Sequence, residues 1–236
     1  IRLSHSAKET YEQCAFKYKL KYIDKWRTKR EGSALVFGNA LDNAFSTMLL
    51  NKDAQNCLEL GQNEFFLSWS KHQFNWNIDY FKSDTNISLL SLKTMEYIDN
   101  FQDQSKRDQL TAWCSLNQKG QRMIESYYKN LIPKVKKVIS IQKEIKLEGY
   151  DENGNSSGDS IIGFADFIAE IENGDSTVLA VVDNKSTSTP YPKNSVQTKA
   201  QTALYSFSEG IEYGAFFTVN KKDFTTQAII DRVPEI

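Results

Sequence analysis

The first fifty residues carry hydrophobic side chains at helical spacing. Ser6 followed three residues later by Glu9 is typical of an N-terminal capping box, which predicts a helix over residues 7–26. After a loop rich in charge and glycine at 27–33, a second helix is predicted over 36–50. The inward side of the first helix would consist of Tyr11, Cys14, Ala15, Tyr18, Tyr22 and Trp26, and that of the second of Phe37, Ala40, Leu41, Ala44, Phe45 and Met48.

Residues 51–132 lack the β-branched runs that are typical of strands, so they predict a helical insertion that Pro133 ends. The stretch is rich in aromatic residues. At helical spacing such rings are more often core, and stacking on single-stranded bases is the alternative interpretation. The aromatic residues are Phe65, Phe66, Trp69, Phe74, Trp76, Tyr80 and Phe81.

Strand-like patterns begin after Pro133. We predict strands over 135–147, 161–171 and 177–183, with a turn at 151–155, then a helix over 196–207 and strands over 213–219 and 225–233. This order predicts an α/β fold in which helices flank a mixed sheet. The chain would form one domain, 1–236, with its core in 1–50 and 133–236 and the helical insertion in 51–132.

Composition narrows the class of protein. The 236 residues are 40% hydrophobic and 12% aromatic, which favours a globular fold over disorder. The net charge of −1 is uneven, because residues 1–30 hold nine Lys or Arg and three Asp or Glu. The remainder is therefore acidic, as a cluster of metal-binding carboxylates would make it. A lysine-rich helix in solvent explains the basic part almost as well.

The sequence lacks the motifs that are typical of several other classes of protein. The three cysteines are widely spaced, which indicates neither a zinc site nor a disulfide framework. No apolar run reaches the roughly 18 residues of a membrane span, and no apolar leader precedes Ser6, so we expect a cytoplasmic protein without membrane contact. Nucleotide-binding fingerprints and the Gly-x-Ser-x-Gly elbow are also absent.

The predicted hairpin allows a geometric test of one acidic pair. If Gly174-Asp175 is the turn, Asp166 lies directly opposite Asp183, and if Asn173-Gly174 is the turn, the two are diagonal neighbours. Both registers place them on the same face, because side chains alternate along a strand. Lys185, two residues after Asp183, joins that face.

Two facing carboxylates repel each other, and a hard divalent cation would resolve the repulsion by taking oxygen ligands from both. Such a cation would polarise a phosphoryl group and acidify a water, while Lys185 would orient that water or balance transition-state charge. The alternative is a buried Asp–Lys ion pair with the second Asp hydrogen-bonded nearby. The three residues alone leave both interpretations open.

These residues lie in a wider pattern. The segments Gly163-Phe164-Ala165-Asp166 and Val182-Asp183-Asn184-Lys185 resemble the PD-(D/E)XK nuclease superfamily, and more narrowly its RecB-type branch. Three further segments match that branch in order. They are the opening helix from Leu3-Ser4-His5-Ser6 to Tyr18, the Gly-x-x-x-His helix at Gly38–Asp42, and the Gln-x-x-x-Tyr helix at Gln201–Tyr205.

The resemblance implies a role for each matching residue. Asp166, Asp183 and the carbonyl of Asn184 would bind Mg²⁺ or Mn²⁺, and Lys185 would be catalytic. Gln201 and Tyr205 would orient the lysine or contact a phosphate. Relatives often carry an acid on the preceding strand, where Glu144 stands, although a residue facing solvent is the slightly favoured interpretation.

Two positions depart from the family pattern. Asp42 replaces the usual histidine; it would serve as an oxygen ligand, mark a weak or inactive enzyme, or be a surface residue. Cysteines that hold an iron–sulfur cluster in some relatives have no counterpart after Cys114. No cluster is therefore expected, and Cys14 is interpreted as a buried thiol.

The resulting hypothesis is a Mg²⁺- or Mn²⁺-dependent deoxyribonuclease. The resemblance implies an exonuclease in recombination, repair or phage DNA processing, in a bacterial or phage-infected cell. Its partners would be single-stranded or duplex DNA ends and a recombination or single-strand-binding protein. The alternatives are an inactive DNA-binding or partner subunit of the same fold, and an RNA nuclease.

Overall fold

A mixed six-stranded sheet forms the centre of the fold in the computed structural model, which describes residues 2–26, 32–71 and 90–234. The strand order is β1-β3-β4-β5-β6, and β2 pairs with β3. β4 and β5 are parallel, as are β1 and β3, and the other pairs are antiparallel. The strands are β1 (Arg2–Ser4), β2 (Val135–Tyr150), β3 (Ser156–Asn173), β4 (Ser176–Thr187), β5 (Tyr213–Asn220) and β6 (Thr226–Arg232).

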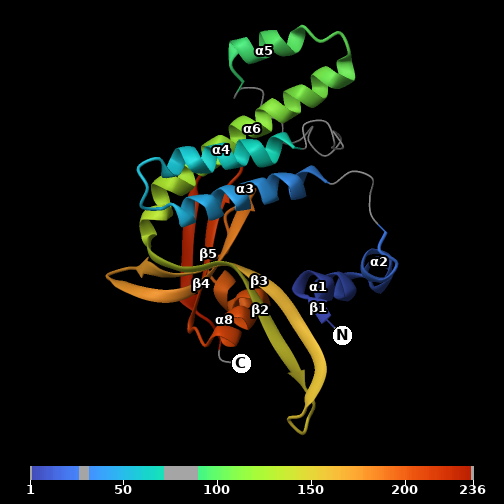
Figure 1. The fold of residues 1–236 in the computed structure, drawn as a ribbon, viewed down its shortest axis with the longest axis vertical. Helices are drawn as coiled ribbons and strands as arrows, with labels where there is room; N and C mark the ends of the chain where they lie inside the picture. The colour runs from blue at the N-terminus through green and yellow to red at the C-terminus, as the bar shows by residue number, and fades with distance from the viewer. Residues whose placement is uncertain (1, 27–31, 72–89, 235–236) are drawn as a thin grey trace.

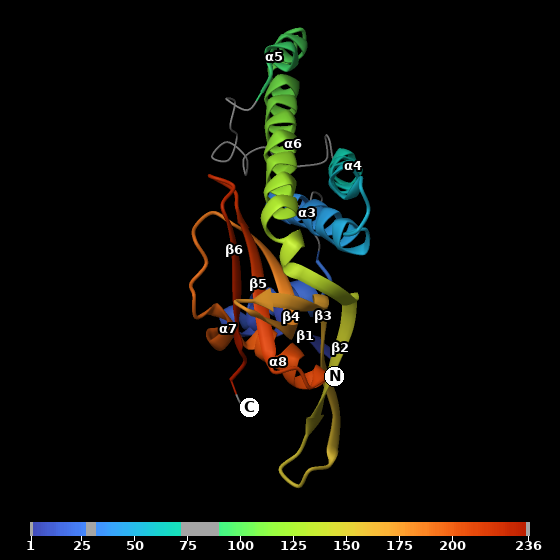
Figure 2. The ribbon, with the colours of Figure 1, turned by 90° about the vertical axis from the view of Figure 1, so that its left-hand side faces the viewer.

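Helices cover both faces of this sheet (Figures 1 and 2). One face packs against α3 (Ser33–Leu50) and α6 (Gln104–Asn130), with α4 (Cys57–Ser70) on α3, and the other against α8 (Ala200–Glu209), which follows the short α7 (Ser195–Thr198). α5 (Leu92–Asp99) lies on the part of α6 that projects beyond the sheet (Figure 1). The predicted mixed sheet flanked by helices, typical of restriction-endonuclease-like proteins, is confirmed.

The described part of the predicted insertion consists of α4, α5 and α6 with turns, and it shares the main core. Phe65 and Trp69 of α4 are fully buried and pack edge to face on Phe37 of α3. Tyr127 of α6 stacks on Phe45 with ring centroids 4.0 Å apart. The core interpretation of these aromatic residues is therefore confirmed for Phe65 and Trp69. Phe66 is partly exposed, and Phe74, Trp76, Tyr80 and Phe81 lie outside the described residues.

The β3–β4 hairpin has the first of the two predicted registers. Asn173 pairs with Ser176 and Phe167 with Val182, so the turn is Gly174-Asp175. Gly174 has a φ of 61°, a left-handed conformation that suits glycine. Asp166 and Asp183 are the next opposing positions in this register, one residue beyond the last bonded pair.

The free edge of β3 near Asp166 is short. β2 follows one edge of β3 from Ser156 to Ile171, which leaves the other edge to β1 and β4. β1 covers that edge up to Ile162, and β4 covers it from Phe167 onward. Residues 163–166, here called the edge gap, have no partner there among the described strands. Asp166 is the last residue of the edge gap.

The first predicted helix is wrong in three respects. It is divided into α1 (His5–Gln13), α2 (Ala15–Tyr18) and the π-helix η1 (Lys19–Ile23), with extended backbone at Cys14. Its N-cap is Ser4 rather than Ser6, because the Ser4 hydroxyl accepts the amide of Ala7. The expected buried stripe is absent: Tyr11, Cys14, Ala15 and Trp26 are exposed, and Tyr18 and Tyr22 only half-buried. The Cys14 thiol is therefore not the buried one that was expected.

Other boundaries differ by less. The predicted helix over 196–207 is interrupted at Lys199, whose backbone is extended. β4 continues four residues past Asp183, so that Asn184 and Lys185 lie within the strand. β1 and the 3-10 helix η4 (Ile132–Lys134) were not predicted. Within the described residues, no helix combines the length and apolarity that crossing a membrane requires.

Candidate active site

Two elements bring carboxylates to one cavity beside the edge gap, and a third brings a lysine. The buried stripe of α3 seats that helix on the sheet and places Asp42 at the cavity, and β3 and β4 supply Asp166 and Lys185. The cavity has a volume of about 250 Å³, and Gly38, one helical turn before Asp42, lines it too. The predicted Gly-x-x-x-Asp pair therefore faces the same space as the hairpin residues.

The carboxylate of Asp166 accepts a main-chain hydrogen bond from the neighbouring strand. Where the β3–β4 ladder ends, the amide of Asn184 donates to Oδ2 of Asp166 at 2.6 Å. Burial, with the negative charges of Asp183 and Asp42, raises the pKa of Asp166 to about 8, although the Asn184 amide and Lys185 oppose the shift. Asp166 thus interacts electrostatically with the other two carboxylates.

Asp183 is buried and forms an ion pair with Lys185. The Lys185 Nζ lies 2.6 Å from Oδ2 of Asp183, whose side chain is only 8% exposed. Burial alone would lower the pKa of Lys185, but the charge and hydrogen bond of Asp183 outweigh it and raise that pKa above its usual value. Lys185 is therefore protonated at neutral pH. The ion-pair geometry is what the alternative interpretation of these residues expected, so both interpretations still describe it.

Asp42 is held by a residue that the sequence analysis missed. The Gln142 Nε2 donates to Oδ2 of Asp42 at 2.9 Å. Gln142 lies opposite Asp166 in the β2–β3 register and has a φ of 51°, a left-handed conformation that is unfavourable for glutamine. Burial and the charge of Asp183 raise the pKa of Asp42, and the bond from Gln142 lowers it. A bulge near the end of the hairpin shifts its register, so the sequence alone did not place Gln142 there.

A second missed residue, Tyr127, holds Asn184 from the other side. The Tyr127 hydroxyl donates to Oδ1 of Asn184 at 2.9 Å. Tyr127 is fully buried between Phe45 and Phe217. Burial and the charges of Asp166 and Asp42 raise its pKa well above the usual value, so it remains a hydrogen-bond donor. The predicted insertion therefore contributes directly to the orientation of Asn184.

Gln201 and Tyr205 lie one turn apart on α8, as predicted, but reach different places. The Gln201 Nε2 lies 3.4 Å from the Tyr205 hydroxyl. Gln201 lines a second cavity of about 260 Å³ together with Lys185 and Tyr191. Tyr205 is buried against the edge gap, where its ring and hydroxyl occupy the space that a Cβ at Gly163 would need. Lys185 therefore lies between two cavities, one shared with Asp42 and the other with Gln201.

Glu144 lies apart from these contacts. Glu144 is exposed and pairs with Phe164, two residues before Asp166, which matches the favoured interpretation of a residue that faces solvent. His5 is the first residue of α1, and its side chain lies outside what the structure describes.

The donor chemistry suits a hard divalent cation, although the side chains are not yet arranged around one. Asp42, Asp166 and Asp183 offer carboxylate oxygens, the ligands that Mg²⁺ and Mn²⁺ prefer. In the described ranges, no three His, Cys, Asp or Glu side chains converge closely enough to hold an ion. Burial and the nearby carboxylates both raise the pKa of Asp166, and a bound cation would oppose that shift.

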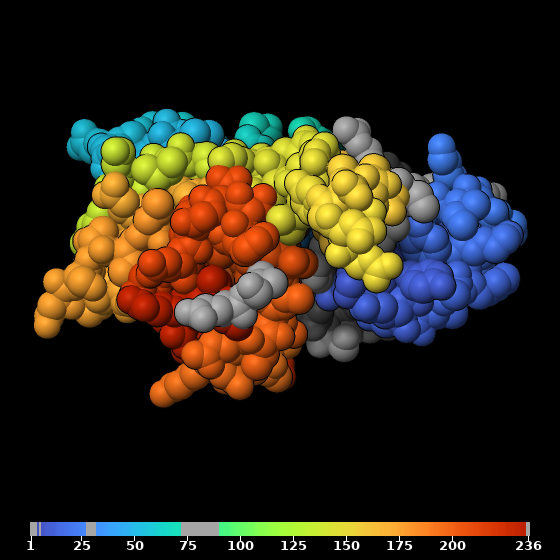
Figure 3. Space-filling model, turned by 90° about the horizontal axis from the view of Figure 1, so that it is seen from below, coloured from blue at the N-terminus to red at the C-terminus, as the bar shows by residue number. Residues whose placement is uncertain are grey.

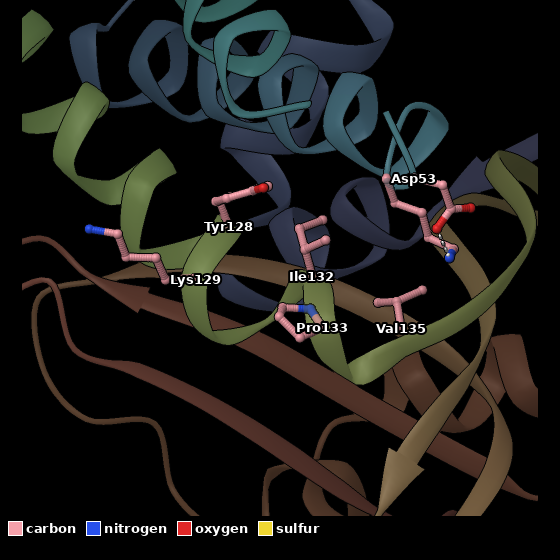
Figure 4. A pocket seen from close by; sticks show the side chains of 7 residues that line it. Asp53, Tyr128, Lys129, Ile132, Pro133 and Val135 are labelled. Carbon is pink, nitrogen blue, oxygen red and sulfur yellow. Dashed lines mark hydrogen bonds and ion pairs between the residues drawn. The ribbon is translucent and has the colours of Figure 1, made fainter. Parts of the chain in front are cut away.

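A larger cavity elsewhere has fewer groups that could bind a metal ion or act in catalysis. It measures about 400 Å³ and lies between the end of α6 and the start of β2 (Figure 4). Its polar groups include Tyr128, Lys129 and the ion pair of Lys52 with Asp53, whose atoms are 2.7 Å apart. The acid is already paired and no second carboxylate joins it in the cavity lining, so volume alone does not make this cavity the active site.

Comparisons with known proteins place the same segments in one family. A model of the PD-(D/E)XK nuclease superfamily matches residues 2–208. No curated protein is detectably similar to the chain. Among solved structures, one titled "Crystal structure of SSO0001" is 17% identical, with 65% of this chain and 67% of that chain covered and a TM-score of 0.32. A likeness of that size says nothing about activity.

Proposed function

This chain belongs to the PD-(D/E)XK nuclease superfamily, and from that premise we propose a metal-dependent deoxyribonuclease with its reaction centre at Asp166, Asp183 and Lys185. The observation that carries the proposal is that Asp42 and Asp166 line one cavity with Lys185, whose Nζ lies 2.6 Å from the carboxylate of Asp183. A purely structural ion pair would need only Asp183 and Lys185. The hydrogen bond that Asp166 accepts from Asn184 fits this alternative, but the half-buried Asp42 beside these groups would remain unexplained.

Asp42, Asp166, Asp183 and the carbonyl of Asn184 would hold the cation. When bound, Mg²⁺ or Mn²⁺ supplies Lewis acidity at a phosphodiester and lowers the pKa of a water. The ion pair between Lys185 and Asp183 must loosen for Asp183 to serve as a ligand. Lys185 would then be free to turn toward the substrate.

Lys185 would stabilise the charge that develops during hydrolysis. As the bond from water oxygen to phosphorus forms and the bond to the leaving nucleotide oxygen breaks, negative charge accumulates on the phosphoryl oxygens. A protonated lysine between the two cavities is suited to balance that charge. Gln201, which shares a cavity with Lys185, would orient the lysine or contact a neighbouring phosphate.

Exonuclease action in recombination, repair or phage DNA processing rests on the resemblance to the RecB-type branch. A single-strand-binding or recombination protein would be the natural partner in that setting. A second candidate function is an inactive DNA-binding subunit, which the ion pair of Lys185 and the lack of three converged ligands among the described residues favour.

Cleavage of end-labelled and circular DNA, single- and double-stranded, decides between these functions. With Mg²⁺ or Mn²⁺ the protein should degrade linear DNA, and EDTA should stop it. Lys185→Ala should reduce the rate by about 10²–10³-fold, as the loss of a group that stabilises transition-state charge does. Lys93→Ala, a change at an exposed lysine of α5 beyond the sheet, should leave the rate unchanged.

Three outcomes have distinct meanings. Resistance of the circles would establish an exonuclease. Faster cleavage of a matched RNA strand would favour the RNA nuclease instead. The absence of cleavage with either metal would overturn the enzymatic proposal in favour of the binding subunit.

A further inference from the structure

The aromatic side chains between Ala15 and Trp26 are not packed into the hydrophobic core. α2 and η1 have no buried residue. Phe16 is 67% exposed and Trp26 is 70% exposed, close to the 58% of Tyr11 at the end of α1. We call residues 14–26 the N-terminal arm, which forms a lobe at one side of the molecule (Figure 3). Several exposed rings on one short segment are unusual unless the surface binds something.

Contacts among three tyrosines hold the N-terminal arm in shape. Tyr11 packs edge to face on Tyr18, with ring centroids 5.4 Å apart, and Tyr18 stacks on Tyr22 at 5.3 Å. The Tyr22 hydroxyl interacts with Ser6 and Thr10 of α1. These contacts fold η1 back toward α1. Phe16 and Trp26 are thereby presented on an ordered surface rather than on a loose tail.

The charge of the arm is complementary to a polyanion. Residues 14–26 contain four lysines and one acidic residue, Asp24, which pairs with Lys19 at 2.7 Å. Lys17 lies next to Phe16, and Lys25 lies next to Trp26. Each exposed ring therefore has a lysine as its chain neighbour. Rings for bases and lysines for phosphates are the two components of single-strand binding surfaces.

The arm is continuous with the proposed active site through α1. Lys8 and Glu9 of α1 line the second cavity, which also contains Lys185, Tyr191, Lys199 and Gln201. After α1 the chain enters the arm at Cys14. A strand bound to the arm thus has a route along α1 to the lysine. An acidic protein partner would have no reason to extend toward that cavity.

We propose that the N-terminal arm binds unpaired DNA, with Phe16 and Trp26 stacked on bases and Lys17 and Lys25 near the phosphates. Paired bases are already stacked on each other and cannot accept these rings without unpairing. The arm therefore selects a single-stranded segment and leads it toward Lys185. This inference rests on the proposed function for its direction, but the binding itself does not require catalysis.

Fluorescence anisotropy with a labelled 20-nucleotide single strand and a matched hairpin duplex tests the proposal, in EDTA so that no cleavage occurs. Phe16→Ala/Trp26→Ala should weaken single-strand binding by at least about tenfold, since base–aromatic stacking is worth that much per ring. Duplex binding should change less than about twofold, because its bases offer no free face. Trp26→Phe keeps a ring and should bind nearly as the wild type.

Tyr97→Ala is the matched control, because Tyr97 is a similarly exposed ring on α5, away from the arm. It should leave both affinities unchanged. Wild-type affinity of the double variant for single strands, an equal loss on duplex, or no single-strand binding by the wild type would each overturn the proposal. Because binding is measured in EDTA, where no cleavage occurs, a failure of catalysis cannot be mistaken for a failure of the arm.

Discussion

The amide of Asn184 donates a 2.6 Å hydrogen bond to the carboxylate of Asp166 where the ladder between β3 and β4 ends. A side-chain acceptor thus replaces a main-chain carbonyl at the point where the two strands separate. The bond fixes the orientation of Asp166 relative to the neighbours of Asn184 in sequence, Asp183 and Lys185. The carboxylate is at once a structural acceptor and a candidate ligand, and these roles can be separated by mutation.

Asp166→Asn keeps the acceptor but removes the charge, and should stabilise the metal-free protein at high pH. The pKa of Asp166 is about 8 in the folded protein and 3.8 ordinarily, so folding favours the protonated form. Its contribution to stability is complete below about pH 4 and is lost as the pH rises to about 8. At pH 9 the variant should gain at least about 1 kcal/mol in urea unfolding.

The wild type should therefore lose stability between pH 4 and 8 in EDTA, and the variant should show a flatter profile over that window. Asp183→Asn is the contrasting change, because it leaves Lys185 without its partner and should destabilise the fold. Identical pH profiles for the wild type and Asp166→Asn would show that Asp166 ionises normally.

Asp42→Ala should weaken Mn²⁺ binding by at least about tenfold if Asp42 is a ligand, as the loss of groups at a metal site commonly does. Asp42→His should restore Mn²⁺ binding better than Mg²⁺ binding, since imidazole suits the softer ion. A thermal shift titrated with each metal measures both effects. Asp108→Ala, at an exposed acid on α6, is the control. Equal Mn²⁺ shifts in the wild type, this control and both Asp42 variants would show that Asp42 is not a ligand.

Gln142→Gly and Gln142→Ala should separate backbone strain from the hydrogen bond to Asp42. Both variants lose the 2.9 Å bond, so both should bind Mn²⁺ more weakly than the wild type. Only glycine tolerates a φ of 51° without cost, so Gln142→Gly should be more stable than Gln142→Ala by about 1 kcal/mol. Unfolding and Mn²⁺ titration of the pair measure the two effects, and weakened binding in only one variant would contradict this account.

Gly163→Ala should destabilise the protein by about 1–3 kcal/mol, because its Cβ would overlap the buried ring of Tyr205. The cost should shrink when Tyr205→Ala is also present, since the space is then free. A double-mutant cycle by chemical unfolding measures the coupling. Strict additivity of the two changes would mean that α8 shifts away from β3 without difficulty.

The sequence predicted the hairpin and its chemistry better than it predicted the surroundings. Alternation and a glycine turn are local signals, so Asp166, Asp183 and Lys185 could be grouped on one face from the order of the residues alone. Gln142 and Tyr127 were missed because their positions depend on a strand register with a bulge and on helix packing. Neither leaves a periodic pattern.

The N-terminal helix shows the opposite error. Helical spacing of Tyr11, Tyr18 and Trp26 indicated a buried stripe, yet the chain bends at Cys14 and these rings face outward or one another. Periodicity reports which side chains share a face. It does not report whether another element covers that face, which is decided by tertiary packing.

The edge gap has a consequence for how the centre would open. Ile168 to Ile171 are flanked by β2 and β4, so their amides should exchange with solvent deuterium only through unfolding of the whole sheet. Residues 163–166 are flanked on one edge alone and should exchange through smaller fluctuations. Asp166 stands at the boundary between these two regimes. Asp166 can therefore move with the edge gap, while the next residue, Phe167, stays anchored to strands on both sides.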